Sequence, residues 1–265
     1  MGSVGKKKTT SALEEYVKNG DTRIFKGKAS GSHTYEFNGT MPMLSFFNSH
    51  SNYDELLNGL SRNEISHMRR WTEGHFMRGQ QYKGWDSMTD SDKERTQFYD
   101  DLIDRSTINQ GFSTTRLATT ELLFGKKMST ITEADLKRVM GTEVVSKGHM
   151  STGAAEQGLT IGSSKPIEYR LFTLGATKGV GMYIGDTRVN GWGYQQREVM
   201  INRDTVWKPV GYSWDNSRRV WVVDMQYMGN QRHDYGKSGR YKYDEDEQSR
   251  KLLKKLSKYS DYDGV

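Results

Sequence analysis

The sequence predicts an α+β protein, with a helical front half followed by a β core. Before residue 141, apolar side chains recur every three or four residues in several segments, which is the spacing of amphipathic helices. After residue 141, short apolar runs separated by glycines and polar turns indicate strands. Because the helices come first and the strands later, the order argues against alternating βαβ units.

Helix signals occur in separate segments of the front half. The clearest segment reads "LSRNEISHMRRW", in which Ser61 and Glu64 have the spacing of a capping box. Ile65, Met68 and Trp71 follow at three-residue steps and would share one face of the helix. The expected helices are residues 10–20, 60–71 and 91–104, and a helix that begins at Thr132.

Strand signals fill most of the second half. They are short apolar stretches rich in β-branched and aromatic residues, and glycines or polar turns bound them. The expected strands are residues 141–152, 167–174, 179–185, 198–205, 206–212 and 219–228.

The chain is expected to form one principal domain with an extension at each end. Residues 1–41 are rich in glycine, serine, threonine and lysine and are interpreted as a polar N-terminal arm. Residues 42–228 would form the main domain, and residues 229–265 a charged C-terminal extension. Within this extension, residues 244–259 place acidic side chains first and lysines last, which suits a short helix.

The composition excludes several chemistries. The chain has no cysteine, so disulfides, thiolate nucleophiles and zinc–thiolate sites are excluded. Its six histidines are scattered and no HExxH motif occurs, so no metal site is expected. No run approaches the roughly 18 apolar residues of a membrane span, and no apolar segment follows the charged N-terminus. We therefore expect no membrane partner, no secretory signal peptide, and a cytoplasmic location in the producing or target cell.

Three stretches of the chain carry a shared signature. Arg116 lies at the end of a β-prone run in "GFSTTRLATT", "KGHMSTG" spans residues 147–153, and "GYQQREVMI" spans residues 193–201. In this order they resemble the arginine, Ser-Thr-Ser and Gln/Glu-x-Glu signature of the toxin-type mono-ADP-ribosyltransferases, which include clostridial exoenzymes and bacteriophage enzymes. The resemblance covers roughly residues 50–228. It implies a split two-sheet β core of the ADP-ribosyltransferase type, with residues 42–228 as the catalytic domain.

The resemblance also implies NAD as co-substrate and a role for each matching residue. Arg116 would bind the NAD phosphates, because a guanidinium pairs with phosphate through two parallel hydrogen bonds. Glu198 would stabilise the positive charge that develops on the ribose as the bond to nicotinamide breaks. Ser151 would hold Glu198 in place and, with Thr152, would line the NAD site. The chain would thus be a glycosyltransferase that needs no metal.

The acceptor of ADP-ribose is expected to be a group other than arginine on a macromolecule. In the family that the chain resembles, a glutamate at the first position of the Gln/Glu-x-Glu motif accompanies arginine acceptors, whereas here Gln196 stands there. Trp192 and Tyr194 lie in the target-reading loop and would recognise the substrate together with Gln196. A net charge of +6 and a pI near 9.2 favour polyanionic partners. A host protein or a nucleic acid would accept ADP-ribose, and an antitoxin or immunity protein would be a further partner.

Departures from the family pattern leave alternatives open. Leucine follows Arg116 where the family has glycine, so Arg105 is the rival for the NAD-binding arginine. Gly153 replaces the last serine of the Ser-Thr-Ser motif. His149 stands at a position where an apolar aromatic is common, and it is expected to be a packing or solvent-facing residue and not a catalyst. Two other functions remain open, namely ADP-ribosylation of RNA or DNA bases and a non-catalytic phage or partner-binding module with the same fold.

Overall fold

The computed structural model describes residues 12–29, 37–72, 88–158, 166–191 and 196–231. The helices are α1 (Ala12–Lys18), α2 (Phe37–His50), α3 (Tyr53–Asn58), α4 (Arg62–Thr72), α6 (Asp90–Asp104), α7 (Glu121–Phe124) and α8 (Glu133–Val139). The strands are β1 (Thr22–Arg23), β2 (Thr107–Ile108), β3 (Gly111–Ala118), β4 (Val144–Ser146), β5 (Met150–Gly153), β6 (Ile167–Phe172), β7 (Thr177–Lys178), β8 (Gly181–Tyr183), β9 (Glu198–Ile201), β10 (Thr205–Asp215) and β11 (Val220–Asn230). The helix expected over residues 244–259 lies outside the described residues.

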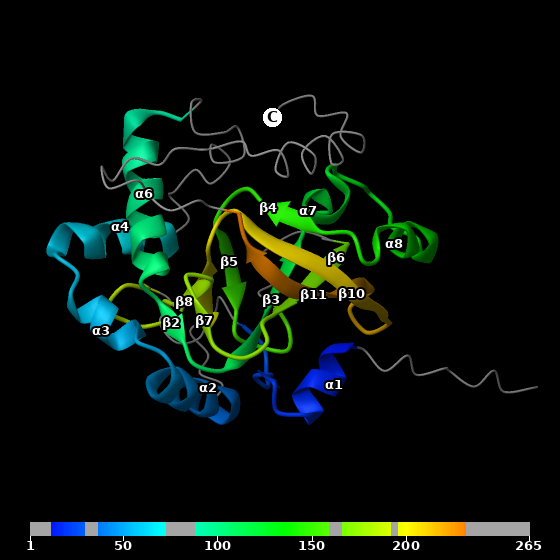
Figure 1. Ribbon diagram of the computed structural model, residues 1–265, viewed down its shortest axis with the longest axis horizontal. Coiled ribbons are helices and arrows are strands. Elements are labelled where there is room, and N and C mark those ends of the chain that lie inside the picture. Colours follow the sequence, from blue (N-terminus) through cyan, green and yellow to red (C-terminus); the bar gives the residue numbers. More distant parts are fainter. Residues whose placement is uncertain (1–11, 30–36, 73–87, 159–165, 192–195, 232–265) are drawn as a thin grey trace, which may run out of the picture.

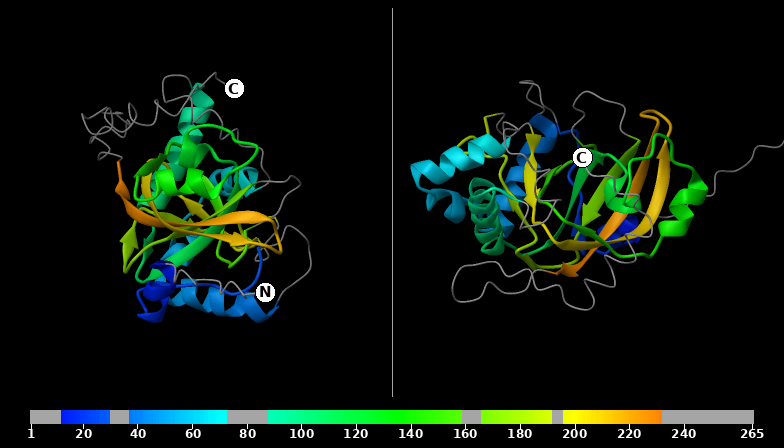
Figure 2. Two further views of the ribbon diagram at one scale, coloured as in Figure 1. Left: turned by 90° about the vertical axis from the view of Figure 1, so that its right-hand side faces the viewer. Right: turned by 90° about the horizontal axis from the view of Figure 1, so that it is seen from above.

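A large mixed sheet forms the centre of the molecule, with helices α2, α3, α4 and α6 beside one end of it (Figure 1, left). Its strand order is β4-β10-β11-β6-β3-β5-β9-β8, and β1 adds to β3 in parallel. Strands β2 and β7 form a separate two-stranded sheet. The views in Figure 2 show α7 and α8 at the opposite end of the sheet from α3 and α4. The predicted α+β class, with the helices first, is confirmed.

The large sheet is split between β3 and β5. These two strands share only one paired position in the ladder, Thr115 with Gly153, whereas β3 pairs with β6 over six positions. On the far side of the split, β5 pairs with β9 from Met150 to Gly153. The predicted two-part β core is therefore present as two strand groups joined at a narrow contact.

One expected strand is in fact two. Residues 141–152 read as a single β-prone stretch, but they form β4 and β5, which lie in different parts of the sheet. The chain bends at Gly148, whose carbonyl accepts a hydrogen bond of 2.8 Å from Ser146 Oγ. The bend lets β4 pair with β10 while β5 continues across the split to β9.

The capping signals of the sequence are confirmed in two helices. At α4, Glu64 N donates to Ser61 Oγ at 3.4 Å, and Ser61 N donates back to Glu64 Oε2 at 2.7 Å. At α8, Thr132 and Asp135 exchange the corresponding bonds at 3.2 and 3.0 Å. These reciprocal bonds satisfy backbone donors that a helix N-terminus otherwise leaves without partners.

Helices α2 and α3 were not predicted from sequence. The stretch that forms α2 contains Pro42, which lacks the N–H for an intrahelical bond and therefore weakens the local helix signal. Tertiary packing supplies the missing stabilisation, since Met43 and Phe47 are fully buried. The Phe47 ring stacks on Tyr183 of β8 with the ring centroids 4.6 Å apart.

Residues 12–29, one of the two described parts of the expected N-terminal arm, pack onto the β core. Leu13 of α1 is fully buried, and β1 runs parallel to β3. Phe25 lies between two aromatic rings of α2, with centroids 5.1 Å from Phe46 and 5.5 Å from Phe47. This segment is thus part of the hydrophobic core, although the sequence assigns it to a polar arm outside the main domain.

A buried charge cluster ties α6 to the strands on the far side of the split. Asp100 of α6 is fully buried. It accepts hydrogen bonds from Arg203, which lies just after β9, at 3.0 Å from Nε and 2.7 Å from Nη2. His149, just before β5, places Nε2 2.9 Å from Asp100 Oδ1 and packs edge-on against Tyr99. Of the two expected positions for His149, packing and solvent-facing, the structure shows the buried one. Burial lowers the pKa of His149, and the nearby Asp100 carboxylate only partly opposes this effect.

We expect the free energy of unfolding to increase with pH over the range in which His149 is protonated in the unfolded chain but neutral in the folded protein. In the unfolded chain the imidazole titrates near its ordinary pKa of about 6.5, whereas burial lowers this pKa in the folded protein. Between these two values the unfolded state binds more protons, so stability is lost as pH falls through this window. The slope would reach at most about 1.4 kcal/mol per pH unit.

Urea unfolding measured at a series of pH values below about 7 tests this expectation. His149→Gln removes the titrating group and should flatten the slope relative to the unsubstituted protein. An equally steep slope in this variant would assign the pH dependence to other groups.

Candidate functional site

Glu198 is the first residue of β9 and meets Ser151 across the β5–β9 ladder. The register pairs Gly153 with Glu198 and Ser151 with Met200, so Ser151 and Glu198 lie diagonally on the same face. Ser151 Oγ donates a hydrogen bond of 2.5 Å to Glu198 Oε1. The structure therefore joins the second and third motifs of the sequence through this contact.

Two further side chains donate to the same carboxylate. Trp71 Nε1 of α4 donates to Glu198 Oε1 at 3.0 Å, and Asn190 Nδ2 donates to Glu198 Oε2 at 3.1 Å. Glu198 is only 4% exposed, so these neutral donors replace the water that burial removes. Both carboxylate oxygens are thereby held in a fixed orientation.

Gln196 lies beside Glu198, but not for the reason that the sequence suggests. Two residues that stand two apart in a strand project to the same side, and Gln196 and Glu198 would be such a pair. However, β9 begins only at Glu198, and Arg197 adopts a left-handed backbone with φ +49°. Asn190 instead connects the two side chains, because its Nδ2 also lies 3.4 Å from Gln196 Oε1. This is a correction of the strand geometry, while the proximity of the two side chains is observed.

Of the two candidate arginines, Arg116 lies at this site. It projects from β3, and its Nη1 donates a hydrogen bond of 2.7 Å to the Ser151 carbonyl. Arg105 is exposed at the C-terminal end of α6, where its Nε donates to the Asp101 carbonyl at 3.1 Å. The structure thus brings Arg116, Ser151 and Glu198 together across the split in the sheet.

The other predicted site residues are not brought into this contact network. Thr152 alternates to the opposite side of β5, where its Oγ1 donates to the Val199 carbonyl at 2.8 Å, and it is 4% exposed. Its hydroxyl stabilises the β5–β9 pairing in the structure. Trp192 and Tyr194, predicted to recognise the substrate, lie outside the described residues.

Comparison with solved structures identifies the fold. No protein-family model and no curated protein matches the sequence. C3stau2 from S. aureus, solved with NAD, superposes with a TM-score of 0.55 at 15% identity and covers 79% of this chain and 100% of its own. The ADP-ribosyltransferase toxin Plx2a from Paenibacillus larvae gives 0.56 at 13% identity, covering 72% and 96%. The Clostridium limosum C3 exoenzyme gives 0.56 at 12% identity, covering 78% and 98%.

The chain has the toxin-type ADP-ribosyltransferase fold. The resemblance found in three short motifs therefore extends to the architecture that carries them. In the described part of this fold, no helix is long and apolar enough to cross a membrane. Nor do His, Asp and Glu side chains gather there in a group that could hold a metal ion.

Within this ADP-ribosyltransferase fold, the turn between Gln196 and Glu198 is anchored to the N-terminal segment. Arg197 is only 1% exposed, and its guanidinium donates to the Lys26 carbonyl and, at 3.4 Å, to Thr40 Oγ1. A Cβ at Gly27 would lie 2.9 Å from Arg197 Nη1, so glycine provides the room for the guanidinium. The left-handed turn that orients Glu198 is therefore fixed by residues far away in sequence.

The loop that carries Asn190 is anchored to α3. Arg188 donates to Asp186 Oδ1 at 2.9 Å and to Asp54 Oδ1 at 2.7 Å. Burial alone would raise the pKa of Asp186, but the hydrogen bonds from Arg188 outweigh it and lower this pKa. The Asp186 carbonyl in turn accepts from Asn190 N at 2.9 Å. This chain of contacts fixes the backbone from which the Asn190 amide reaches Glu198.

Sequence reasoning missed Trp71 and Asn190 as site residues. Trp71 was placed on the apolar face of its helix, and an indole on such a face is usually a packing residue. Asn190 lies in a polar loop in which an asparagine commonly forms turns. No spacing rule connects Trp71 with a glutamate 127 positions later, so only the tertiary structure reveals the contact.

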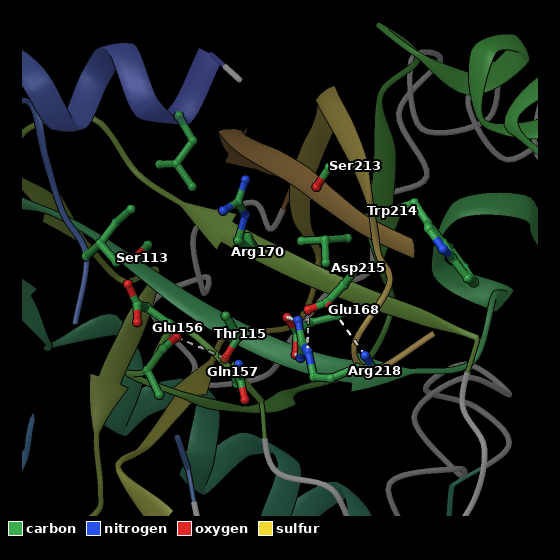
Figure 3. A pocket seen from close by; sticks show the side chains of 14 residues that line it. Ser113, Thr115, Glu156, Gln157, Glu168, Arg170, Ser213, Trp214, Asp215 and Arg218 are labelled. Carbon is green, nitrogen blue, oxygen red and sulfur yellow. Dashed lines mark hydrogen bonds and ion pairs between the residues drawn. The ribbon is translucent and has the colours of Figure 1, made fainter. Parts of the chain in front are cut away.

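A separate pocket of about 400 Å³ lies over β3, β6 and the β10–β11 hairpin. Figure 3 shows Arg218 directed at Glu168, to which it donates from Nη1 at 2.6 Å and from Nη2 at 2.9 Å. Arg170 in the same pocket donates to Asp224 at 2.5 Å. These charges are paired with one another, and the arginine, serine and glutamate of the three motifs do not line this pocket.

We expect Arg197→Ala to lower the free energy of unfolding by about 2–4 kcal/mol. The substitution removes a buried guanidinium and leaves the Lys26 carbonyl without its donor. Arg219→Ala is a matched control, because Arg219 also has a left-handed backbone, with φ +55°, but is exposed in the β10–β11 turn. This control should change stability by less than about 0.5 kcal/mol. Equal effects of the two substitutions in urea unfolding would assign the cost to the backbone and not to the anchor.

Proposed function

We propose that the protein is an NAD-dependent mono-ADP-ribosyltransferase. It would transfer ADP-ribose from NAD to an acceptor other than arginine on a macromolecule. The observation that carries the proposal is the Glu198 carboxylate, which Ser151 Oγ fixes at 2.5 Å within a fold of the toxin ADP-ribosyltransferase type. Among similar structures, C3stau2 was solved with NAD and the toxin BECa with NADH.

The reaction requires a fixed negative charge beside the ribose. The bond between ribose C1′ and the nicotinamide nitrogen breaks, and nicotinamide leaves with the electron pair. The acceptor forms a bond to C1′ and loses a proton. Positive charge develops on the ribose between these events, and a preorganised carboxylate stabilises it. Glu198 suits this role because it is buried, so its field is weakly screened by water.

Arg116 supplies the cation for the phosphates of NAD. A guanidinium binds phosphate through parallel N–H donors, and Arg116 lies on the Ser151 side of the site. Ser151 Oγ would keep the Glu198 carboxylate in the orientation that the ribose requires. These roles use only groups that the fold brings together across the split between β3 and β5.

The position of Gln196 supports the proposal that the acceptor is a group other than arginine. Its side chain is 9% exposed and lies at the entrance of β9, close enough to Asn190 to share a donor with Glu198. A neutral amide at this position would orient an acceptor by hydrogen bonds without attracting a guanidinium. The chain's net charge of +6 favours a polyanionic acceptor, so bases of RNA or DNA form the second candidate acceptor class.

Incubation of the purified protein with labelled NAD and a cell lysate tests the activity. The unsubstituted protein should release nicotinamide and label a macromolecule, whereas Glu198→Gln should reduce the rate at least about 100-fold. Glu133→Gln is a matched control, because the Glu133 side chain is exposed at the start of α8, and it should retain activity. Label removed by protease but not by nuclease would identify a protein acceptor, and the reverse a nucleic acid.

Nicotinamide release that is equal in Glu198→Gln and in the unsubstituted protein would exclude the enzymatic proposal. It would favour the third function, a non-catalytic module that retains this fold. Circular dichroism of each variant would verify that the comparison is made between folded proteins.

We expect Arg116→Lys to raise the KM for NAD at least about tenfold, because lysine cannot pair with phosphate through a planar fork. Arg105→Lys is the matched control, since Arg105 lies at the exposed end of α6. This control should leave KM within about twofold of the starting value. Initial rates of NAD hydrolysis at varied NAD concentration measure both. A raised KM in Arg105→Lys alone would reverse the assignment of the two arginines.

A further inference from the structure

On the basis of the proposed function, we infer that Trp71 and Asn190 are positioning residues for the Glu198 carboxylate. Glu198 Oε1 accepts from Trp71 Nε1 at 3.0 Å in addition to Ser151, and Oε2 accepts from Asn190 Nδ2 at 3.1 Å. Ser151 alone contacts one oxygen, which leaves the carboxylate plane able to rotate about that contact. Donors on both oxygens remove this rotation.

The indole of Trp71 is rigidly placed. Trp71 is 2% exposed and packs edge-on against Tyr99 with centroids 5.1 Å apart, and edge-on against His149 with centroids 6.0 Å apart. These neighbours come from α6 and from the start of β5, so the ring is held from two directions. An indole nitrogen can only donate, so it complements the acceptor oxygens of a carboxylate.

Asn190 links Glu198 with the residue proposed to choose the acceptor. One Nδ2 group lies 3.1 Å from Glu198 Oε2 and 3.4 Å from Gln196 Oε1. Asn190 is 2% exposed, and its backbone N–H donates to the Asp186 carbonyl at 2.9 Å. The amide therefore sets the position of Gln196 relative to the carboxylate, whereas the Trp71 indole N–H donates to the carboxylate.

The two contacts predict different kinetic effects. Loss of the Trp71 donor should lower the kcat of NAD hydrolysis and the rate of transfer to the acceptor by the same factor, about 10- to 100-fold. Loss of the Asn190 amide should lower transfer more than hydrolysis, because Gln196 also loses its partner. In both cases the KM for NAD should change less than about threefold, since the lost hydrogen bonds go to Glu198, whereas Arg116 is held by the Ser151 carbonyl.

Trp71→Phe tests the first effect, with Trp207→Phe as a matched control. Trp207 is also fully buried, and its Nε1 donates at 2.8 Å to Thr205 Oγ1 instead of to a carboxylate at the site. Both substitutions remove an indole N–H and similar volume, so thermal unfolding should show comparable losses of stability. Only Trp71→Phe should lower kcat. A folded Trp71→Phe variant with the kcat of the Trp207→Phe control would overturn the role of Trp71.

Asn190→Ala tests the second effect and does not depend on core packing around the indole. A fall in the ratio of ADP-ribose transfer to NAD hydrolysis supports the role of Asn190. Unchanged rates of hydrolysis and transfer would overturn the inference that donors on both carboxylate oxygens position Glu198. This result can be obtained even if Trp71→Phe fails to fold. The unsubstituted protein is assayed alongside. If it neither hydrolyses NAD nor transfers ADP-ribose, the proposed function fails. If the unsubstituted protein is active and the variants have the same rates of NAD hydrolysis and ADP-ribose transfer, only the inference about Trp71 and Asn190 fails.

Discussion

The burial of the Glu198 carboxylate is the constraint on which this part of the molecule depends. A charged group that leaves water opposes folding unless polar neighbours compensate for the lost hydration. The donors come from a neighbouring strand, from a helix of the front half and from the loop before β9, namely Ser151, Trp71 and Asn190. A shift of any of these three elements relative to β9 would remove a donor from the buried carboxylate. The polar site therefore also determines how the helical half packs on the sheet.

The packing of the N-terminal segment against β5 accounts for glycine at position 153 in the Ser-Thr-Ser motif. Gly153 stands where the Ser-Thr-Ser signature has its last serine, and it provides the one ladder contact between β3 and β5. A Cβ at Gly153 would lie 2.7 Å from the Cβ of Ala29 in the N-terminal segment, closer than side-chain atoms approach one another. Glycine at this position thus allows the N-terminal segment to lie against the end of β5. The same segment receives the Arg197 guanidinium at the Lys26 carbonyl. The motif departure and the buried N-terminal segment are two aspects of one packing arrangement.

The sequence predicts those parts of the fold whose signals are local. Capping boxes at Ser61 and Thr132 mark helix starts because the bonds join residues three apart. Helix α2 escaped prediction because its stability comes from the aromatic contacts of Phe47, which are distant in sequence. The motif residues Arg116, Ser151 and Glu198 could be found from a family signature, but their partners Trp71 and Asn190 could not. A hydrogen bond between residues 127 positions apart produces no periodic pattern in the sequence. Because Trp71 lies on an apolar helix face, its indole N–H is not recognised as a hydrogen-bond donor from the sequence.

The two roles proposed for the site, stabilisation of the ribose by Glu198 and orientation of the acceptor by Gln196, rest on different numbers of contacts. Glu198 is fixed by the β5–β9 ladder and by donors on both of its oxygens. Gln196 lies before the strand, beyond a left-handed residue, and is connected to the site by one contact of 3.4 Å from Asn190. A substitution of Gln196 itself therefore removes one hydrogen bond of its side chain, whereas a substitution of Glu198 affects helix, strand and loop together. Under the proposed function, this difference in physical coupling would allow the acceptor to change while the Glu198 carboxylate keeps its orientation.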